Sequence, residues 1–284
     1  MTWDDLDAHL DGVPGTVSAY VGRLDAPPTW TRHADAAHYA ASTMKVAVLA
    51  ALHRATEAGT LDLDAPVPII NEFDSAQSGA PRFSCAQPYD NDDAVWDRLG
   101  GTAPLRWLAD RMIVRSSNLA TNLVIGHVGL PAVAEVWALA GARNSVTGRG
   151  IEDFAARDAG ITNVVTAADL AALLGALASG ARSPGKLASP AACSAMLDVL
   201  LAQEHREDLA AGLPEGTRIA HKNGWVRGVR HGAGVVLPDD APPYLIAVCT
   251  TTDPADGTSD EDEDDACLLI AHISAQVWAA RHQL

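Results

Sequence analysis

Residues 40–52 read AASTMKVAVLAAL and decide the fold. Their apolar side chains predict a buried helix, and Gly59 supplies a signal for its end. Ser42 and Lys45 are three residues apart, so they share one face of the first turn. Because burial disfavours the charged form of a lysine, its pKa falls and it can take the proton of a serine hydroxyl. The positive end of the helix would favour the oxyanion formed when Ser42 attacks a carbonyl.

The same two residues also fit an ordinary surface helix, because the pattern Ser-x-x-Lys fixes only two positions and both residue types are common. By itself this alternative is favoured. The elements on either side of residues 40–52 therefore have to decide between the two interpretations.

Strand patterns lie near both ends of the chain, and helical patterns fill its middle. We predict strands at 16–24, 29–32, 218–223, 229–237 and 244–251, and helices at 2–11, 104–114, 118–128, 131–139, 170–178, 191–203 and 267–280. Segments 60–100 and 141–163 are predicted as irregular, and 253–265 as an acidic loop. Terminal strands must pair with each other to bury their faces. The predicted fold is α+β, an antiparallel sheet flanked by helices (1–39 and 205–284), with an inserted all-helical domain (40–204) and a cleft where they meet.

The composition excludes several classes of partner. The 284 residues carry a net charge of −16, with 36 acidic and 20 basic side chains, which argues against nucleic acid or an anionic membrane. No run of 18 apolar residues predicts a membrane span, and no signal peptide is recognised at the N-terminus. We therefore expect a cytoplasmic protein with four reduced cysteines, three of them buried. We expect no cofactor and no metal.

Three short patterns follow one another along the chain: Ser42-Thr43-Met44-Lys45, Ser116-Ser117-Asn118 and Lys222-Asn223-Gly224. The first opens the buried helix, the second lies in a turn between two helices, and the third ends a strand. Together and in this order they resemble the three motifs of class A β-lactamases and penicillin-binding proteins. The resemblance extends from about residue 14 to the last helix, and it implies a serine β-lactamase-like fold.

The resemblance implies a role for each motif residue. Ser42 is acylated with Lys45 as its base, and Ser116 passes a proton to the leaving group. Asn118 binds the acyl side chain, and Lys222 supplies positive charge near Ser116 and a substrate carboxylate. The remaining assignments are the oxyanion donors Ser42 and Trp225, the strand glycine Gly224, and Arg230, which is similar to an arginine that grips the substrate carboxylate. A cross-strand ion pair is an equal alternative for Arg230.

Class A β-lactamases also use a glutamate to activate the deacylating water, and Glu152 is the best candidate for it. Asp153 is its rival, and a structural ion pair between Glu152 and Arg149 is the third possibility. The family's asparagine four residues after the glutamate is replaced by Ala156. Because alanine cannot form the hydrogen bond of that asparagine, we expect the deacylating water to be held less firmly.

Two further departures affect the motifs themselves. Ser117 replaces an aspartate, and Asn223 replaces a threonine or serine whose hydroxyl commonly holds the substrate carboxylate. The amide of Asn223 can still donate a hydrogen bond with a changed geometry, so Asn223 is assigned to substrate binding. Both affect recognition of a β-lactam more than the chemistry of the acyl-enzyme. The sequence therefore predicts a serine hydrolase that acts on a small molecule with a carboxylate. β-Lactamase activity is the first hypothesis, an intracellular esterase, amidase or peptidase of the same superfamily the second, and an acyl-trapping or ligand-binding protein without turnover the third.

Overall fold

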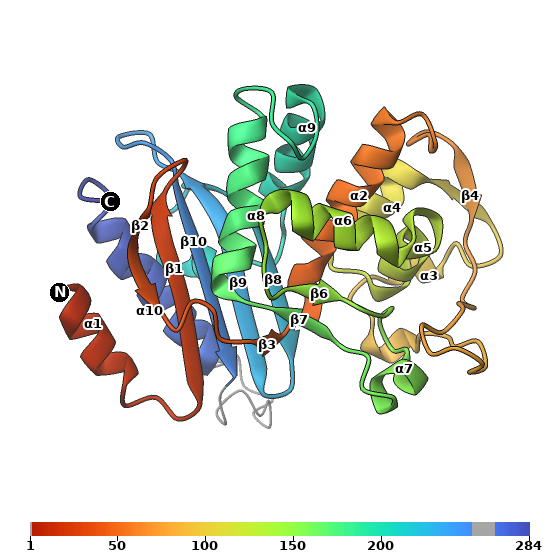
Figure 1. The fold of residues 1–284 in the computed structure, drawn as a ribbon, viewed down its shortest axis with the longest axis horizontal. Coiled ribbons are helices and arrows are strands. Elements are labelled where there is room, and N and C mark those ends of the chain that lie inside the picture. Colours follow the sequence, from red (N-terminus) through yellow and green to blue (C-terminus); the bar gives the residue numbers. More distant parts are fainter. Residues whose placement is uncertain (1, 252–264) are drawn as a thin grey trace.

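Strands from the two ends of the chain pair in one antiparallel sheet, as predicted (Figure 1). The computed structural model describes residues 2–251 and 265–284. The sheet has the order β2-β1-β10-β9-β8 and consists of β1 (Thr16–Arg23), β2 (Pro28–Arg32), β8 (Arg218–Val226), β9 (Val229–Leu237) and β10 (Tyr244–Thr251). The pairing of β1 with β10 joins the two ends of the sequence, with Thr16 opposite Thr251 and Arg23 opposite Tyr244. The α+β fold class is thereby confirmed.

Alternating side chains on β10 bury both faces of this sheet. Leu245, Ala247 and Cys249 pack in the core that also contains α8 (Ala167–Gly180). Ile246 and Val248 point the other way, into a second core with α1 (Trp3–Leu10) and α10 (Asp265–Ala279). A period of two is what a strand covered on both faces requires. Figure 1 shows α8 on one face of the sheet and α10 on the other.

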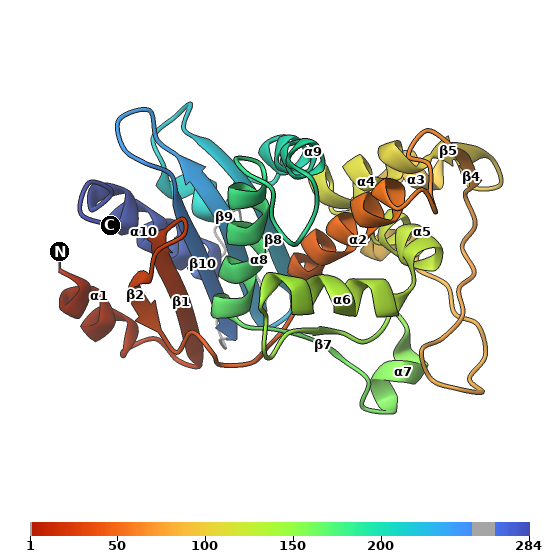
Figure 2. The ribbon, with the colours of Figure 1, turned by 45° about the horizontal axis from the view of Figure 1, so that its top comes forward.

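A group of helices lies beside the β8 edge of the sheet and surrounds α2 (Figure 2). Its members are α2 (Lys45–Glu57), α4 (Leu105–Val114), α5 (Asn118–Val128), α6 (Leu130–Ala140) and α9 (Pro190–Leu201). Every residue of α2 from Lys45 to His53 is buried, so this helix has no solvated face over two turns. That burial excludes the surface-helix alternative for the Ser-x-x-Lys pattern.

Several short elements were not predicted. They are β3 (His38–Tyr39), β4 (Pro66–Pro68), η2 (Gln87–Tyr89), α3 (Asp93–Trp96), β5 (Thr102–Pro104), β6 (Val146–Thr147), α7 (Phe154–Asp158), β7 (Asn163–Val165) and η3 (Leu209–Gly212). The expectation of irregular chain throughout 141–163 was therefore wrong. β3, β7 and β6 form a small sheet of their own, and elements of two to five residues are too short to show a period.

Ser42 is also placed differently from the prediction. It lies in the 3-10 helix η1 (Ala41–Met44), which precedes α2, instead of in the first turn of one continuous α-helix. The N–H and the hydroxyl of Thr43 both donate to the carbonyl of Ala40, at 3.2 and 2.6 Å, and this tightens the turn. The third motif differs slightly too, because β8 continues to Val226 and contains the motif within the strand.

The division into 1–39 plus 205–284 and 40–204 stays a prediction. α8 falls within 40–204 but packs on the sheet, and its core continues into the helices around α2. All four cysteines are buried, whereas three were expected to be, and none of them forms a disulfide among the described residues. The predicted acidic loop lies outside the described residues up to position 264. None of the described helices can cross a membrane alone by length and composition. α5 and α6 together could, but they meet at 90°.

Candidate active site

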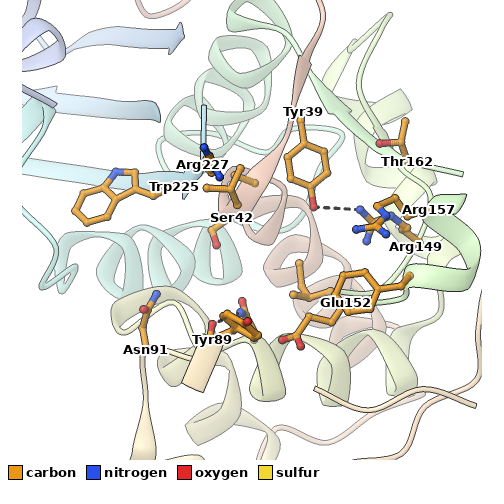
Figure 3. A pocket seen from close by; sticks show the side chains of 15 residues that line it. Tyr39, Ser42, Tyr89, Asn91, Arg149, Glu152, Arg157, Thr162, Trp225 and Arg227 are labelled. Carbon is orange, nitrogen blue, oxygen red and sulfur yellow. Dashed lines mark hydrogen bonds between the residues drawn. The ribbon is translucent and has the colours of Figure 1, made fainter. Parts of the chain in front are cut away.

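Ser42 lines a cleft of about 640 Å³ between the helices and the β8 edge of the sheet. Figure 3 shows Trp225 and Arg227 beside Ser42, and Tyr89 and Glu152 below it in the view. Tyr39 and Arg149 lie across the cleft from Trp225. The chain segments that line the cleft are 39–42, 89–91, 118, 149–162 and 225–227. The site is therefore assembled from parts of the chain that are far apart in sequence.

Lys45 is fully buried one turn behind Ser42, and its ammonium group joins the first motif to the second. Its Nζ donates to the carbonyl of Ser116 at 2.8 Å and to the amide oxygen of Asn118 at 3.0 Å, and it lies 3.3 Å from the Ser116 hydroxyl. Burial lowers the pKa of Lys45 to about 7, although the carboxylate of Asp90 acts in the opposite direction. Near neutral pH a large share of Lys45 is thus unprotonated and able to accept a proton.

The second motif is held in place by Asp90, which the sequence analysis did not single out. The carboxylate of Asp90 accepts the backbone N–H groups of Asn118 (3.1 Å) and Leu119 (2.8 Å) and the Ser117 hydroxyl (3.2 Å). Ser117 itself caps α5 through the N–H of Ala120. Asp90 thus supplies at the start of α5 the carboxylate that Ser117 lacks, where a negative charge is favourable.

The third motif lies on β8 against the turn that carries Ser42. A Cβ placed on Gly224 would lie 3.1 Å from the backbone nitrogen of Ser42 and 3.2 Å from the carbonyl of Ala40. A glycine therefore lets β8 approach η1 this closely, and any side chain there would require a shift of a few tenths of an ångström. The backbones of Ser42 and Trp225 are brought close together, and their role as oxyanion donors remains a prediction.

Lys222 and Asn223 are both buried, and neither side chain lines the cleft. The Lys222 ammonium donates to the Asn223 carbonyl (3.1 Å) and to its side-chain oxygen (2.8 Å). Burial, reinforced by the charge of Lys45, holds the pKa of Lys222 well below its usual range. Asn223 therefore serves the neighbouring lysine in this structure.

Arg230 lies opposite Trp225 on β9. Its Nη1 donates to the carbonyls of Val226 (2.7 Å) and Val229 (2.9 Å) at the turn between the two strands. Arg227, which the sequence analysis did not consider, lines the cleft instead of Arg230. The assignment of Arg230 to a substrate carboxylate stays a prediction.

Glu152 lines the cleft, with one carboxylate oxygen bound to the protein. Oε2 accepts the N–H of Ala86 at 3.0 Å, whereas Oε1 is buried and has no partner among the described residues. Burial raises the pKa of Glu152. Arg149, the third possibility raised by the sequence, forms no ion pair with Glu152. Arg149 donates instead to the Gly150 carbonyl (3.1 Å) and the Tyr39 hydroxyl (3.2 Å).

Asp153 is fully buried and its two oxygens are occupied. Oδ1 accepts the Ser75 hydroxyl (2.7 Å) and the Ala156 N–H (3.2 Å), and Oδ2 accepts the Ala76 N–H (2.8 Å). Asp153 thus caps α7 and fastens it to residues 75–76. Glu152, which faces the cleft, is the better placed of the two carboxylates.

Three of the non-glycine residues with positive φ belong to this site: Ala41 (45°), Ser116 (59°) and Glu152 (65°). Alanine, serine and glutamate rarely adopt this conformation, and its cost is of the order of 1–3 kcal/mol at each position. Such strain persists only where the surroundings fix the backbone. Each of these three residues either carries or adjoins a side chain assigned to the chemistry.

Comparison with known proteins agrees with this geometry. The sequence profile described as the beta-lactamase enzyme family matches residues 2–280. The chain belongs to the beta-lactamase enzyme family. This membership makes it a β-lactamase-like hydrolase and confirms the resemblance on which the motif assignments depend. No curated protein matches the chain.

Solved structures share the fold over nearly the whole chain. The β-lactamase from Sphaerobacter thermophilus is 27% identical, with a TM-score of 0.78 and 98% of each chain covered. PBP-A is 23% identical, with a TM-score of 0.78 over 99% of this chain and 96% of that one. The class A β-lactamase from Mycobacterium abscessus is 19% identical, with a TM-score of 0.79 and 99% of each chain covered. At this level of identity PBP-A and the mycobacterial enzyme support the fold alone.

Proposed function

We propose that this protein hydrolyses an amide, with a β-lactam as the first substrate class to test, through an ester formed on Ser42. The observation that carries the proposal is the buried Lys45 ammonium, which lies one turn from Ser42 and is bound to Ser116 and Asn118. Family membership and the β-lactamase from Sphaerobacter thermophilus support the same chemistry.

In the acylation step, neutral Lys45 takes the proton of Ser42 Oγ as that oxygen bonds to the substrate carbonyl carbon. The carbon–nitrogen bond then breaks, and the leaving nitrogen receives a proton through Ser116, whose hydroxyl lies 3.3 Å from Lys45 Nζ. The assignment of Lys222 to the anionic groups of the substrate stays a prediction, because its side chain is buried and does not line the cleft. The resulting ester remains on Ser42.

In the deacylation step, the free oxygen of Glu152 accepts a proton from water while the water oxygen attacks the ester carbon. The bond to Ser42 Oγ breaks, and the proton that Glu152 took from water passes to Ser42 Oγ, which restores both the serine hydroxyl and the carboxylate. The pairing of Oε2 with Ala86 leaves Oε1 as the oxygen that would hold this water.

Intact-mass analysis tests acylation directly. After incubation with benzylpenicillin, a cephalosporin or p-nitrophenyl acetate, we expect an adduct on the wild-type protein and none on Ser42→Ala. We also expect turnover to fall at least about 10³-fold, because only binding and oxyanion stabilisation remain. Ser78→Ala, at an exposed serine outside the cleft, is the matched control. Undiminished turnover by Ser42→Ala would defeat the mechanism.

An esterase, amidase or peptidase is the second candidate, and the position of Asn223 favours it. The amide oxygen of Asn223 accepts a hydrogen bond from Lys222, and the side chain does not line the cleft. Asn223 therefore places no polar group where a β-lactam carboxylate is expected to bind. Ester turnover without β-lactam turnover in the same experiment would select this candidate.

A further inference from the structure

The guanidinium group of Arg149 is buried at the edge of the cleft without a counter-charge. Arg149 is only 3% exposed, and its guanidinium group donates to two neutral acceptors, the Gly150 carbonyl and the Tyr39 hydroxyl. Its Nε has no partner, and no carboxylate of the described residues forms an ion pair with it. A buried cation that lacks a paired anion is costly, so an arginine in this state is suited to an anion from outside the chain.

The surroundings of Arg149 are those of a binding subsite. Tyr39, Arg157 and Thr162 line the same end of the cleft (Figure 3). The Arg157 guanidinium lies 4.7 Å from the centre of the Phe154 ring, and within 2–251 and 265–284 its one ion pair is with the exposed neighbour Asp158. An exposed ion pair of this kind contributes little, so Arg157 can turn to a ligand at small cost. In a chain with a net charge of −16, two arginines at one end of the cleft form a local positive site.

This end of the cleft suits the acyl part of a substrate. Ser116, the proposed proton donor to the leaving group, is buried against Lys45 and does not line the cleft, whereas residues of the loop 149–162 do. Glu152 leaves the same loop, but its carboxylate is directed toward Tyr89 and away from Arg149 (Figure 3). A negative group near Arg149 would thus avoid the one carboxylate that lines the cleft.

We propose that Arg149, assisted by Arg157 and the Tyr39 hydroxyl, binds a carboxylate on the acyl portion of the substrate. This proposal rests on the proposed function, because the acyl portion is the part of the substrate that becomes the ester on Ser42. It makes the substrate an amide or ester whose acyl group carries its own negative charge. A guanidinium recognises a carboxylate through two parallel N–H groups, which gives both charge and direction.

A pair of penicillins that differ by one carboxylate tests the specificity. We expect wild-type protein to be acylated faster by α-carboxybenzylpenicillin than by benzylpenicillin. Arg149→Gln should lower the ratio of the two acylation rate constants by about 10-fold or more, the effect of losing a charge-assisted hydrogen bond. Arg149→Lys should retain part of the ratio, because it keeps the charge. Arg106→Gln removes an exposed arginine that pairs with Asp64 far from the cleft, and it should leave the ratio as in wild type.

A binding measurement keeps the proposal testable if Arg149→Gln folds poorly or if no penicillin reacts. Glutarate should raise the melting temperature of the wild-type protein and of Ser42→Ala, whereas its neutral diamide should not, and the exposed variant Arg157→Gln should weaken the effect. Absence of acylation together with glutarate binding would remove the proposed function but support the carboxylate site. An unchanged rate ratio in a folded Arg149→Gln protein would overturn the site. Chloride or phosphate acting as well as glutarate would also overturn it, in favour of an inorganic anion.

Discussion

Lys45 has no exposed surface, and its Nζ lies among the carbonyl of Ser116, the hydroxyl of Ser116 and the amide oxygen of Asn118. These acceptors compensate part of the lost hydration, but burial still lowers its pKa to about 7. Only the unprotonated amine can take the proton of Ser42. We therefore expect the acylation rate to rise as pH increases through about 7 and to level off above it.

Stopped-flow acylation between pH 5.5 and 9 measures this profile. Lys45→Arg should lose about 10²–10⁴-fold in acylation rate and lose the rise near pH 7, because a guanidinium stays charged. Lys186→Arg changes an exposed lysine outside the cleft and serves as the control. A wild-type rate independent of pH across this range would exclude Lys45 as the titrating base.

Glu152 governs the second half of the reaction in the proposed mechanism. Glu152→Gln keeps the hydrogen bond to Ala86 and the size of the side chain, but an amide cannot take a proton from water. The acylation rate should therefore be nearly unchanged, and the acyl-enzyme should accumulate in a mass spectrum recorded after substrate addition. Accumulation in wild type as well would support a protein that traps the acyl group. Turnover retained in Glu152→Gln without accumulation would remove Glu152 from the mechanism.

At the scale of elements, β8 and η1 must approach closely for Ser42 to face the third motif. Gly224→Ala places a methyl group about 3.1 Å from the Ser42 backbone nitrogen, so one element has to shift. We expect a stability loss of about 1–3 kcal/mol from overpacking and a fall of at least about 10-fold in acylation rate.

Gly126→Ala is the matched control for this change. Gly126 lies in α5, and an added Cβ there meets nothing within 4 Å. Replacing a helical glycine by alanine should raise stability by up to about 1 kcal/mol without slowing acylation. Urea unfolding and the acylation rate together separate the two outcomes, and equal rates for both variants would contradict a requirement for close contact between β8 and η1.

Long elements could be predicted from the sequence because their apolar residues repeat over at least two turns or several strand residues. Residues 118–128 and 244–251 were predicted with the bounds that α5 and β10 have. β6, β7 and α7 offered no such repeat, and they form because residues distant in sequence pair with them. His38 and Tyr39 of β3, for example, pair with Val165 and Val164 of β7.

The site could be predicted only where its residues occur in motifs. Ser42, Asn118, Glu152 and Trp225 line the cleft, and Lys45 and Ser116 meet outside its lining, while their roles stay predictions. Asp90 could not be found this way, because it lies in an irregular segment and its role depends on where the chain places it against α5. Arg149 was considered as a partner of Glu152, but only the folded chain shows that it contacts Tyr39.

For the whole molecule, buried histidines make stability depend on pH. Burial lowers the pKa of His38 and His231 to about 4 and that of His221 to about 3. Both ring nitrogens of His231 lie against carbonyl oxygens, Nδ1 at 2.7 Å from Arg230 and Nε2 at 2.8 Å from Tyr39, and these two contacts oppose the effect of burial on its pKa. In the unfolded chain each histidine titrates near 6.5. Between about 4 and 6.5 the unfolded state therefore binds more protons, and acid favours it.

Asp208 acts in the opposite direction, since burial raises its folded pKa to about 7 while its unfolded value is near 3.8. It holds one proton in the folded state over the same range, so it offsets one of the histidine protons. We expect the free energy of unfolding to fall as the pH decreases from about 6.5 to about 4, with each proton of difference contributing about 1.4 kcal/mol per pH unit. Urea unfolding at pH 7, 5.5 and 4.5 measures this slope.

His221→Phe should reduce that slope by about one proton, or roughly 1.4 kcal/mol per pH unit. Neither ring nitrogen of His221 has a partner among the described side chains, so the change sacrifices no known hydrogen bond there. His33→Asn is the control, because His33 is exposed and its φ of 42° suits asparagine. If stability stays constant from pH 7 to 4.5, the buried histidines are not neutral in the folded state. Their protonation would then already be compensated by the groups around them.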